Sequence, residues 1–240
     1  MSLDMFNGST SEDSEPSVYE TYRAPSGKCL SLKLTAEHSL WAHKLWNAAK
    51  VLSDKMFTGE ISVVGKRVLE LGAGAGLPSL TASLMGASYV LATDYPDEPI
   101  LDTLRENAKS TSPDAYSAGS LVVQGYIWGT PLNVDPFDEI FMSDLIFNHR
   151  EHTALVTVIK THLKPQGTCR VLYSHHVPPR RERDLQFFQA CEAARLKVTE
   201  EKTVFTDRMF PEDDGMYVEY PLEWRQNVFY RTVRHGDSNA

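Results

Sequence analysis

Lys66-Arg-Val-Leu-Glu-Leu-Gly-Ala-Gly-Ala-Gly76 is the stretch that decides the fold of this chain. Val68, Leu69 and Leu71 make a short apolar run, which predicts a buried parallel strand. The glycines that end the stretch permit the positive φ of a tight turn and let a ligand approach the backbone. Pro78 then suits the first turn of a helix. Strand, turn and helix together predict half of a nucleotide-type site at the carboxyl end of a strand.

The spacing of the glycines indicates which nucleotide fits. A dinucleotide fingerprint, G-x-G-x-x-G, needs a glycine at the position where this chain has Leu77. The observed G-x-G-x-G, preceded by Glu70, resembles instead the motif of S-adenosylmethionine enzymes. A second apolar run follows and ends in Asp94, whose carboxylate can accept both ribose hydroxyls of a nucleoside. A glycine-rich turn without a ligand is the alternative, and the pairing with Asp94 argues against it.

Apolar and polar segments alternate along the rest of the chain. Beyond the strand at 66–71, strands are expected at 89–93, 120–125, 137–143, 168–174 and 197–205, helices at 77–86, 97–110, 150–163 and 181–195, and an antiparallel edge from 216–220 and 227–234. This alternation predicts an α/β fold with a mostly parallel sheet and helices on both faces. The family resemblance described below implies that this sheet is Rossmann-like and seven-stranded.

Two additions precede this sheet. Residues 18–34 predict a hairpin around a Pro/Gly turn, whose tyrosines are expected to cover the hairpin and not to reach the active site. Residues 38–57 predict an amphipathic helix, and its Trp41 or Trp46 is a candidate cover for the cofactor. Residues 1–17 are acidic and Ser-rich, which predicts a disordered tail before a single domain at 18–240.

Composition narrows the function classes. The 240 residues carry a net charge of −8, which disfavours a nucleic-acid substrate and is compatible with a basic protein partner. Cys29, Cys169 and Cys191 lie far apart and predict reduced, structural thiols. The N-terminal stretch does not resemble a signal peptide, and no apolar run has the length of a membrane span. We therefore expect a cytoplasmic, monomeric protein.

The ligand in such a sheet sits beyond the carboxyl ends of the strands. The residues expected there are the glycines 72, 74 and 76, the segments 94–96 and 128–129, Ser143 to His149, and Tyr173 to His176. Asp144 is the candidate acceptor-side acid, with a helix N-cap as an equal alternative. Phe147 is a candidate cage residue, although phenylalanine more often belongs to a core.

The histidines of this edge are ambiguous from sequence. His149 and His152 have a spacing compatible with a metal, but no clear third and fourth ligand accompanies them, so no metal is expected. His175 and His176 are either general bases or ordinary polar residues at a strand end, with the second interpretation slightly preferred.

The motifs together resemble one family. They are Leu40 to Ala49, Val68 to Pro78, Thr93 to Asp97 and Ser143 to His152. The chain is similar to the fungal elongation factor 1-alpha methyltransferases, formerly described as nicotinamide N-methyltransferase-like, within the seven-stranded lysine methyltransferases. The resemblance implies a class I, S-adenosylmethionine-dependent enzyme that methylates the N-terminal glycine and adjacent lysine of elongation factor 1-alpha. A small-molecule N-methyltransferase and a non-catalytic cofactor-binding protein are the alternatives.

The resemblance also implies roles for particular residues. The cofactor contacts would be Trp46, Gly72, Ala73, Gly74, Asp94, Trp128 and Ser143. Trp46 is preferred to Trp41 by its distance from the glycine turn in related enzymes, and Ser143 stands where relatives have another small residue, alanine. The acceptor side would hold Asp144 and Phe147. Phe147 replaces the tyrosine of a frequent D-x-x-Y motif, so an aromatic wall is expected there without a phenol hydroxyl.

Overall fold

The computed structural model describes residues 18–35, 44–210, 215 and 217–236. Its strands are β1 Val18–Arg23, β2 Cys29–Leu34, β3 Arg67–Leu71, β4 Tyr89–Asp94, β5 Leu121–Gly125, β6 Phe137–Ser143, β7 Leu163–Tyr173, β8 Leu196–Val198, β9 Lys202–Phe205 and β10 Asn227–His235. Its helices are α1 Asn47–Phe57, α2 Leu77–Leu84, α3 Glu98–Thr111, α4 Pro113–Ser117, α5 His152–His162, α6 Arg181–Ala193 and α7 Glu223–Gln226, with 3-10 turns η1 His149–Glu151 and η2 Pro178–Arg180.

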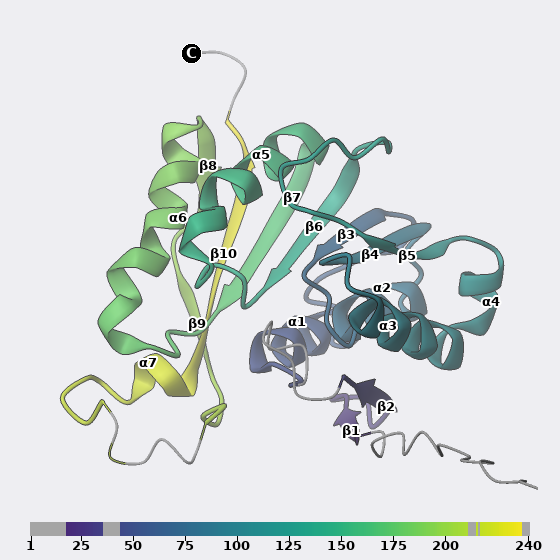
Figure 1. Cartoon of the computed structure of the whole chain (residues 1–240), viewed down its shortest axis with the longest axis horizontal. Helices are drawn as coiled ribbons and strands as arrows, with labels where there is room; N and C mark the ends of the chain where they lie inside the picture. The colour runs from purple at the N-terminus through teal and green to yellow at the C-terminus, as the bar shows by residue number, and fades with distance from the viewer. Residues whose placement is uncertain (1–17, 36–43, 211–214, 216, 237–240) are drawn as a thin grey trace, which may run out of the picture.

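The main sheet has the order β5-β4-β3-β6-β7-β10-β8, and β9 also pairs with β10. Strands β3 to β7 are mutually parallel, with Leu69 opposite Leu91, whereas β10 runs antiparallel to β7. Figure 1 shows α5 and α6 on one side of this sheet and α1, α2 and α3 on the other. The predicted fold class, a mostly parallel sheet covered on both faces, is confirmed, although the described residues form eight strands in this sheet where seven were expected.

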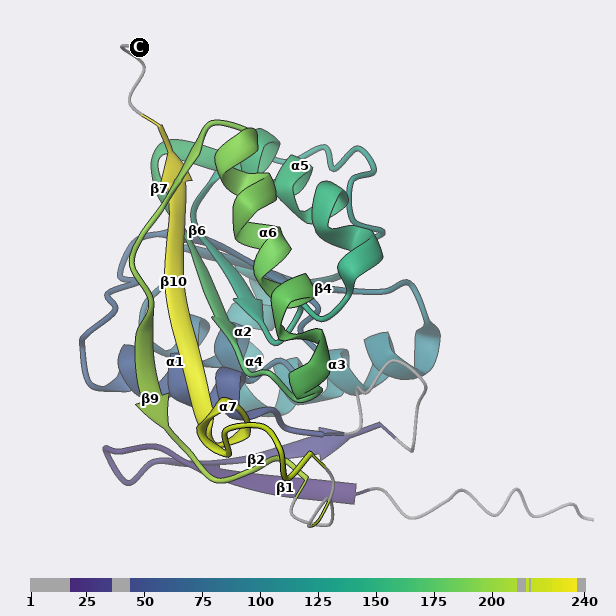
Figure 2. The same ribbon diagram turned by 90° about the vertical axis from the view of Figure 1, so that its left-hand side faces the viewer.

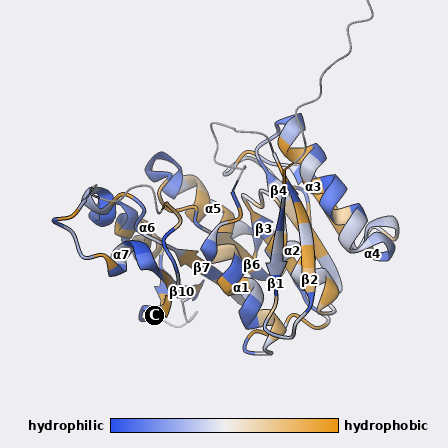
Figure 3. Cartoon of the chain, turned by 90° about the horizontal axis from the view of Figure 1, so that it is seen from below, coloured by the Kyte–Doolittle hydropathy of each residue, from blue (hydrophilic) through white to orange (hydrophobic). Residues whose placement is uncertain are grey.

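Alternation along the strands divides the core into two layers. Val68, Phe141 and Leu172 pack with α1 and α2, whereas their chain neighbours Leu69 and Met142 pack with α5 and α6. Successive strand residues point to opposite faces, so one buried strand feeds both cores. The helices expose polar residues on their outer sides, as the banded colouring of α3 shows in Figure 3.

The predicted N-terminal hairpin is present as β1 and β2, joined in antiparallel register. It lies below α1, α2 and α3 in Figure 2. Asn107 of α3 is buried and bonds to both the N–H and the carbonyl of Lys33 in β2, at 2.8 and 2.9 Å, and to the carbonyl of Ala75 at 3.0 Å. Tyr22 donates to Asp54 of α1 at 2.6 Å. The hairpin tyrosines therefore pack outside the cavity described below.

Three predictions about the strands need correction. The predicted strand 197–205 is two strands, because at the break the Oγ1 of Thr199 accepts the N–H of Thr232 at 2.9 Å in place of a backbone carbonyl. Residues 217–220 form a turn and not a strand: Tyr217 has a φ of 62° and its carbonyl accepts the N–H of Tyr220. The antiparallel strand β10 lies one place inside the edge, where β8 and β9 cover it.

The helix predicted at 38–57 begins later than expected. Trp46 is extended, with ψ at 143°, and α1 starts at Asn47. Residues 38–43 of that prediction, including Trp41, lie outside the described residues, as do the tail predicted at 1–17 and the acidic sequence Glu212 to Asp214. Within the described ranges, no helix has the length and apolar character needed to cross a membrane.

Candidate active site

A cavity of about 430 Å³ opens at the carboxyl edge of the parallel strands. It is lined by Lys44, Leu45, Trp46, Ala49, Glu70, Gly72, Ala73, Gly74, Ala75, Leu77, Asp94, Tyr95, Tyr126, Ile127, Trp128, Ser143, Asp144, Leu145, Phe147, Asn148 and Glu151. A volume of this size suits a small-molecule ligand. All nine residues to which the resemblance assigned a cofactor or acceptor role line this cavity, whereas Gly76, His175 and His176 do not.

The glycine turn after β3 forms the floor of the cavity. Gly72 and Gly74 have φ of 60° and 54°, the left-handed region that favours glycine. A Cβ added at Gly74 would have no protein atom within 4 Å, so the space beside this glycine is open to a ligand. At Gly72 a Cβ would lie 2.6 Å from a terminal methyl carbon of Leu145, so the Leu145 side chain would have to shift.

Asp94 ends β4 beside this turn. Its Oδ2 accepts the N–H of Gly74 at 2.7 Å and its Oδ1 accepts the N–H of Tyr95 at 2.7 Å. These bonds fix the orientation of the carboxylate at the edge of the cavity. The acid predicted from sequence to receive ribose hydroxyls is therefore also the residue that closes the glycine turn.

Glu70 is the fully buried acid of the turn. Its Oε2 accepts both the N–H and the hydroxyl of Ser79 in α2, at 2.9 and 2.5 Å. Burial raises the pKa of this carboxyl to about 8, a change that the Ser79 hydrogen bonds oppose and the charge of Asp94 reinforces. Glu70 is thus mostly protonated near neutral pH. The sequence showed only that Glu70 precedes the glycine motif and did not predict this protonation.

Asp144 follows β6 in a conformation that few residues adopt. Its φ is 55°, and it is only 4% exposed. Its Oδ1 accepts the N–H of Ser174 at 2.9 Å, whereas Oδ2 is buried without a hydrogen-bond partner among the described residues. The N-cap alternative is wrong, because the nearest helical turn begins at His149 and Asn148 precedes it. Strained backbone and unpartnered buried polar atoms are features that recur at functional sites.

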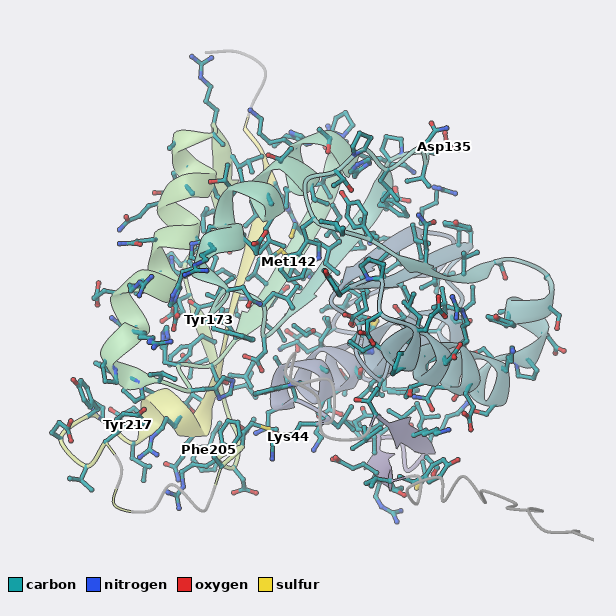
Figure 4. All side chains as sticks on the ribbon, in the orientation of Figure 1. Lys44, Asp135, Met142, Tyr173, Phe205 and Tyr217 are labelled. Atoms are coloured by element: carbon teal, nitrogen blue, oxygen red, sulfur yellow. The ribbon has the colours of Figure 1, made fainter. Side chains whose placement is uncertain are left out.

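Aromatic side chains make the walls. Trp46 comes from the segment before α1, Trp128 from the segment after β5, and Phe147 from the turn after β6. Figure 4 places Lys44 in the lower middle of the molecule and Asp135, which precedes β6, at its upper right. The cavity therefore lies at the end of the sheet where β6 finishes.

The histidines of this edge divide into structural groups. His149 and His175 both bond to the buried Asp184 of α6, at 2.7 Å each, and the Nε2 of His152 lies 2.6 Å from the carbonyl of Ile146. No group of three potential ligands suited to a metal ion occurs within the described residues. His176 makes a different contact from these three histidines, because its Nε2 lies 3.2 Å from Oδ1 of Asp144.

Other predicted and overlooked residues can be placed as well. Cys169 is buried within β7, where burial raises the pKa of its thiol and removes it from nucleophilic chemistry. Lys44, Ile127 and Glu151 line the cavity but were not expected from sequence. Lys44 precedes α1, Ile127 follows β5 and Glu151 ends η1. The available signals were the motifs Leu40 to Ala49 and Ser143 to His152, which contain Lys44 and Glu151, and for Ile127 its place after a strand end.

The cavity has the hydrogen-bonding groups that S-adenosylmethionine needs. Backbone at the glycine turn is open to a ligand, the carboxylate of Asp94 lies beside it, and the buried oxygens Ser143 Oγ and Asp144 Oδ2 have no partner among the described residues. Carboxylates from Asp94, Asp144 and Glu151 outnumber the ammonium of Lys44 along the wall. An excess of negative charge suits a sulfonium ligand and a cationic second substrate.

A family model described as lysine methyltransferase matches residues 27–194. The chain belongs to the lysine methyltransferase family. Within this family it is 38% identical over 198 residues to the protein N-terminal and lysine N-methyltransferase EFM7 of Debaryomyces hansenii, covering 77% of each chain. It is 36% identical over 201 residues to efm7 of Schizosaccharomyces pombe, covering 78% of this chain and 76% of the relative. This lysine methyltransferase is an S-adenosylmethionine-dependent protein N-methyltransferase.

Solved structures support the fold of this lysine methyltransferase. A SAM-dependent methyltransferase from Aquifex aeolicus superposes with a TM-score of 0.55 at 17% identity, covering 75% of this chain and 88% of that one. The ribosomal protein L11 methylase from Lactobacillus delbrueckii gives 0.51 at 17% identity, covering 78% and 80%. At this identity the likeness concerns the fold, which is that of class I methyltransferases.

Proposed function

We propose that this methyltransferase modifies the N-terminal glycine of elongation factor 1-alpha and then the adjacent lysine. The observation that carries the proposal is the buried, unpartnered Oδ2 of Asp144 at the wall of the cavity. An oxygen in that state is completed by a hydrogen-bond donor, and an amine is such a donor. The similarity to protein N-terminal and lysine methyltransferases supports a polypeptide amine as the acceptor.

In this proposal, one half of the cavity binds the cofactor and the other half binds the acceptor amine. Gly72, Ala73 and Gly74 bring the backbone close to the nucleoside, and Asp94 accepts its ribose hydroxyls. Trp46, Trp128 and Ser143 complete that half of the cavity. S-adenosylmethionine supplies an electrophilic methyl group on a sulfonium when it is bound. The remaining work of the protein is to hold an amine in line with that methyl group.

The acceptor half requires a neutral amine. An α-amine has a pKa of about 8 and a lysine side chain of about 10.4, so the N-terminus has the larger neutral fraction near neutral pH. Asp144 orients this amine by accepting a hydrogen bond from one of its N–H groups. The aromatic ring of Phe147 faces the methylated, cationic product and attracts it through its π-electrons. The N-terminus is therefore methylated before the neighbouring lysine, whose deprotonation needs more desolvation.

The experiment compares defined acceptors. The protein is incubated with labelled S-adenosylmethionine and elongation factor 1-alpha carrying a free N-terminal glycine, and the N-terminal peptide is analysed by mass spectrometry. Methyl groups are expected on the α-amine first, and acetylation of the terminus should abolish them. Equal labelling of the acetylated factor would make lysine the primary target. Labelling of nicotinamide alone would favour a small-molecule methyltransferase, and cofactor binding without any labelled acceptor would favour a non-catalytic protein.

The same proposal covers the oligomeric state of the protein, its location in the cell and its lack of nucleic-acid binding. We expect a cytoplasmic monomer that binds no nucleic acid, in keeping with the net charge of −8. Light scattering at the concentration used for the assay checks the monomer.

A further inference from the structure

We propose that His176 is a positioning residue for the transfer reaction, because it supports both the acceptor acid Asp144 and the cofactor wall residue Trp46. His176 itself lies behind the cavity wall and does not line it. The inference rests on the proposed acceptor role of Asp144 and extends it to a residue whose sequence context favoured an ordinary polar function.

The first contact is a hydrogen bond to the acceptor acid. Nε2 of His176 lies 3.2 Å from Oδ1 of Asp144. A carboxylate oxygen only accepts, so Nε2 carries the proton and donates it. The N–H of Ser174 donates to the same oxygen at 2.9 Å. Two donors on Oδ1 fix the rotation of the carboxylate, which leaves the unpartnered Oδ2 for an acceptor amine.

The second contact is between rings. The imidazole of His176 lies 4.9 Å from the Trp46 ring, centroid to centroid, with the planes inclined by 58°. Phe210 closes the group, at 5.8 Å from His176 and 5.9 Å from Trp46. Tilted and edge-on aromatic pairs at these distances are attractive. The orientation of Trp46 at the cavity wall thus depends in part on the same imidazole that holds Asp144.

The backbone around His176 is itself anchored. Its neighbour His175 is fully buried, with Nδ1 at 2.7 Å from Oδ2 of Asp184 in α6. The N–H of His175 donates to the carbonyl of Trp224 in α7 at 3.1 Å. These bonds fix the chain immediately before His176. The side chain of His176 is therefore held in a defined position against Asp144 and Trp46.

Two variants separate the contacts. His176→Phe keeps an aromatic ring against Trp46 and removes the donor to Asp144. His176→Gln keeps an N–H donor near the place of Nε2 and removes the ring. His235→Phe is the matched control, because His235 also uses Nε2 in a hydrogen bond, at 2.9 Å to the carbonyl of Leu163, but lies outside the cavity. Thermal unfolding confirms that each variant is folded.

The expected results are opposite for the two variants. In His176→Phe, kcat for the N-terminal peptide falls about tenfold while cofactor affinity, measured by calorimetry with S-adenosylhomocysteine, stays within about twofold. In His176→Gln, kcat is largely retained while cofactor affinity weakens about 2- to 10-fold. The control changes neither quantity. The proposal would be overturned if both variants lost kcat and cofactor affinity to the same extent. It would also be overturned if neither variant lost kcat or cofactor affinity.

A spectroscopic measurement tests the inference without any acceptor. Long-range ¹H–¹⁵N spectra of the wild-type protein should show His176 with a proton on Nε2, and Asp144→Ala should shift that signal. A His176 imidazole protonated on Nδ1 alone would overturn the positioning role. If the spectra show the Nε2 proton but elongation factor 1-alpha carries no label, the substrate proposal fails and the positioning role stands.

Discussion

The backbone N–H of Gly74 donates a hydrogen bond of 2.7 Å to Oδ2 of Asp94, so the turn after β3 is tied to the acid that ends β4. Parallel pairing of β3 with β4 puts the two strand ends side by side and makes this bond possible. A ligand that contacts either residue therefore depends on the position of both.

Asp94→Ala should weaken cofactor binding. The substitution removes the proposed ribose acceptor and leaves the N–H groups of Gly74 and Tyr95 without their carboxylate. We expect a loss of about 1–3 kcal/mol in the binding of S-adenosylhomocysteine, measured by calorimetry. Asp102→Ala on the exposed face of α3 is the control. Unchanged affinity in Asp94→Ala would remove Asp94 from the cofactor site.

Asp144→Asn should reduce turnover and leave cofactor affinity nearly unchanged. Asparagine keeps an oxygen for the donors Ser174 and His176 but presents an amide N–H₂ to the acceptor amine in place of Oδ2. Misplacing the nucleophile costs about 10²-fold in rate. Steady-state kinetics with the N-terminal peptide measures it. Asp138→Asn, near the start of the same strand, is the control, and a parental rate in Asp144→Asn would refute the acceptor role.

Glu70 should make stability depend on pH. Burial raises its pKa from 4.5 to about 8, so between these values the folded protein holds a proton that the unfolded chain releases. The free energy of unfolding therefore falls as pH rises through this window, by an amount on the order of a few kcal/mol. Glu70→Gln should remove that part of the slope in urea unfolding at about pH 5 and about pH 8.

The comparison for Glu70 is Glu106→Gln, which alters a half-exposed carboxylate paired with Lys33. Its slope should match that of the parent protein. A Glu70→Gln variant that retains the full parental slope would show that another group is responsible.

Asn107→Ala should destabilise the fold. Asn107 satisfies the backbone of Lys33 and the carbonyl of Ala75, so its loss separates the hairpin from the glycine turn. Leaving buried backbone groups without partners costs about 1–3 kcal/mol. Denaturant unfolding measures the change, with Lys109→Ala on the same helix as the control. Equal stability of the two variants would mean that water replaces the amide.

Local patterns were sufficient for the alternating elements of the sheet. The segment Val68 to Gly76 predicts both the strand and the turn that it forms, because a run of apolar residues and the backbone freedom of glycine act within a few residues. Two of the errors fall where pairing with another strand decides the structure. The break between β8 and β9 depends on the side chain of Thr199 bonding to Thr232, and the inner place of β10 depends on which strands pair with it.

For the candidate site, the sequence by itself determined that Gly72, Asp94 and Asp144 meet at the carboxyl edge, because parallel strands end on the same side and carry the residues that follow them there. It did not determine the state of those residues. The protonation of Glu70 follows from complete burial, and the unpartnered oxygen of Asp144 follows from a φ of 55° and from the donors Ser174 and His176. Burial and hydrogen-bond partners arise from segments distant in the chain, so only the tertiary structure decides them.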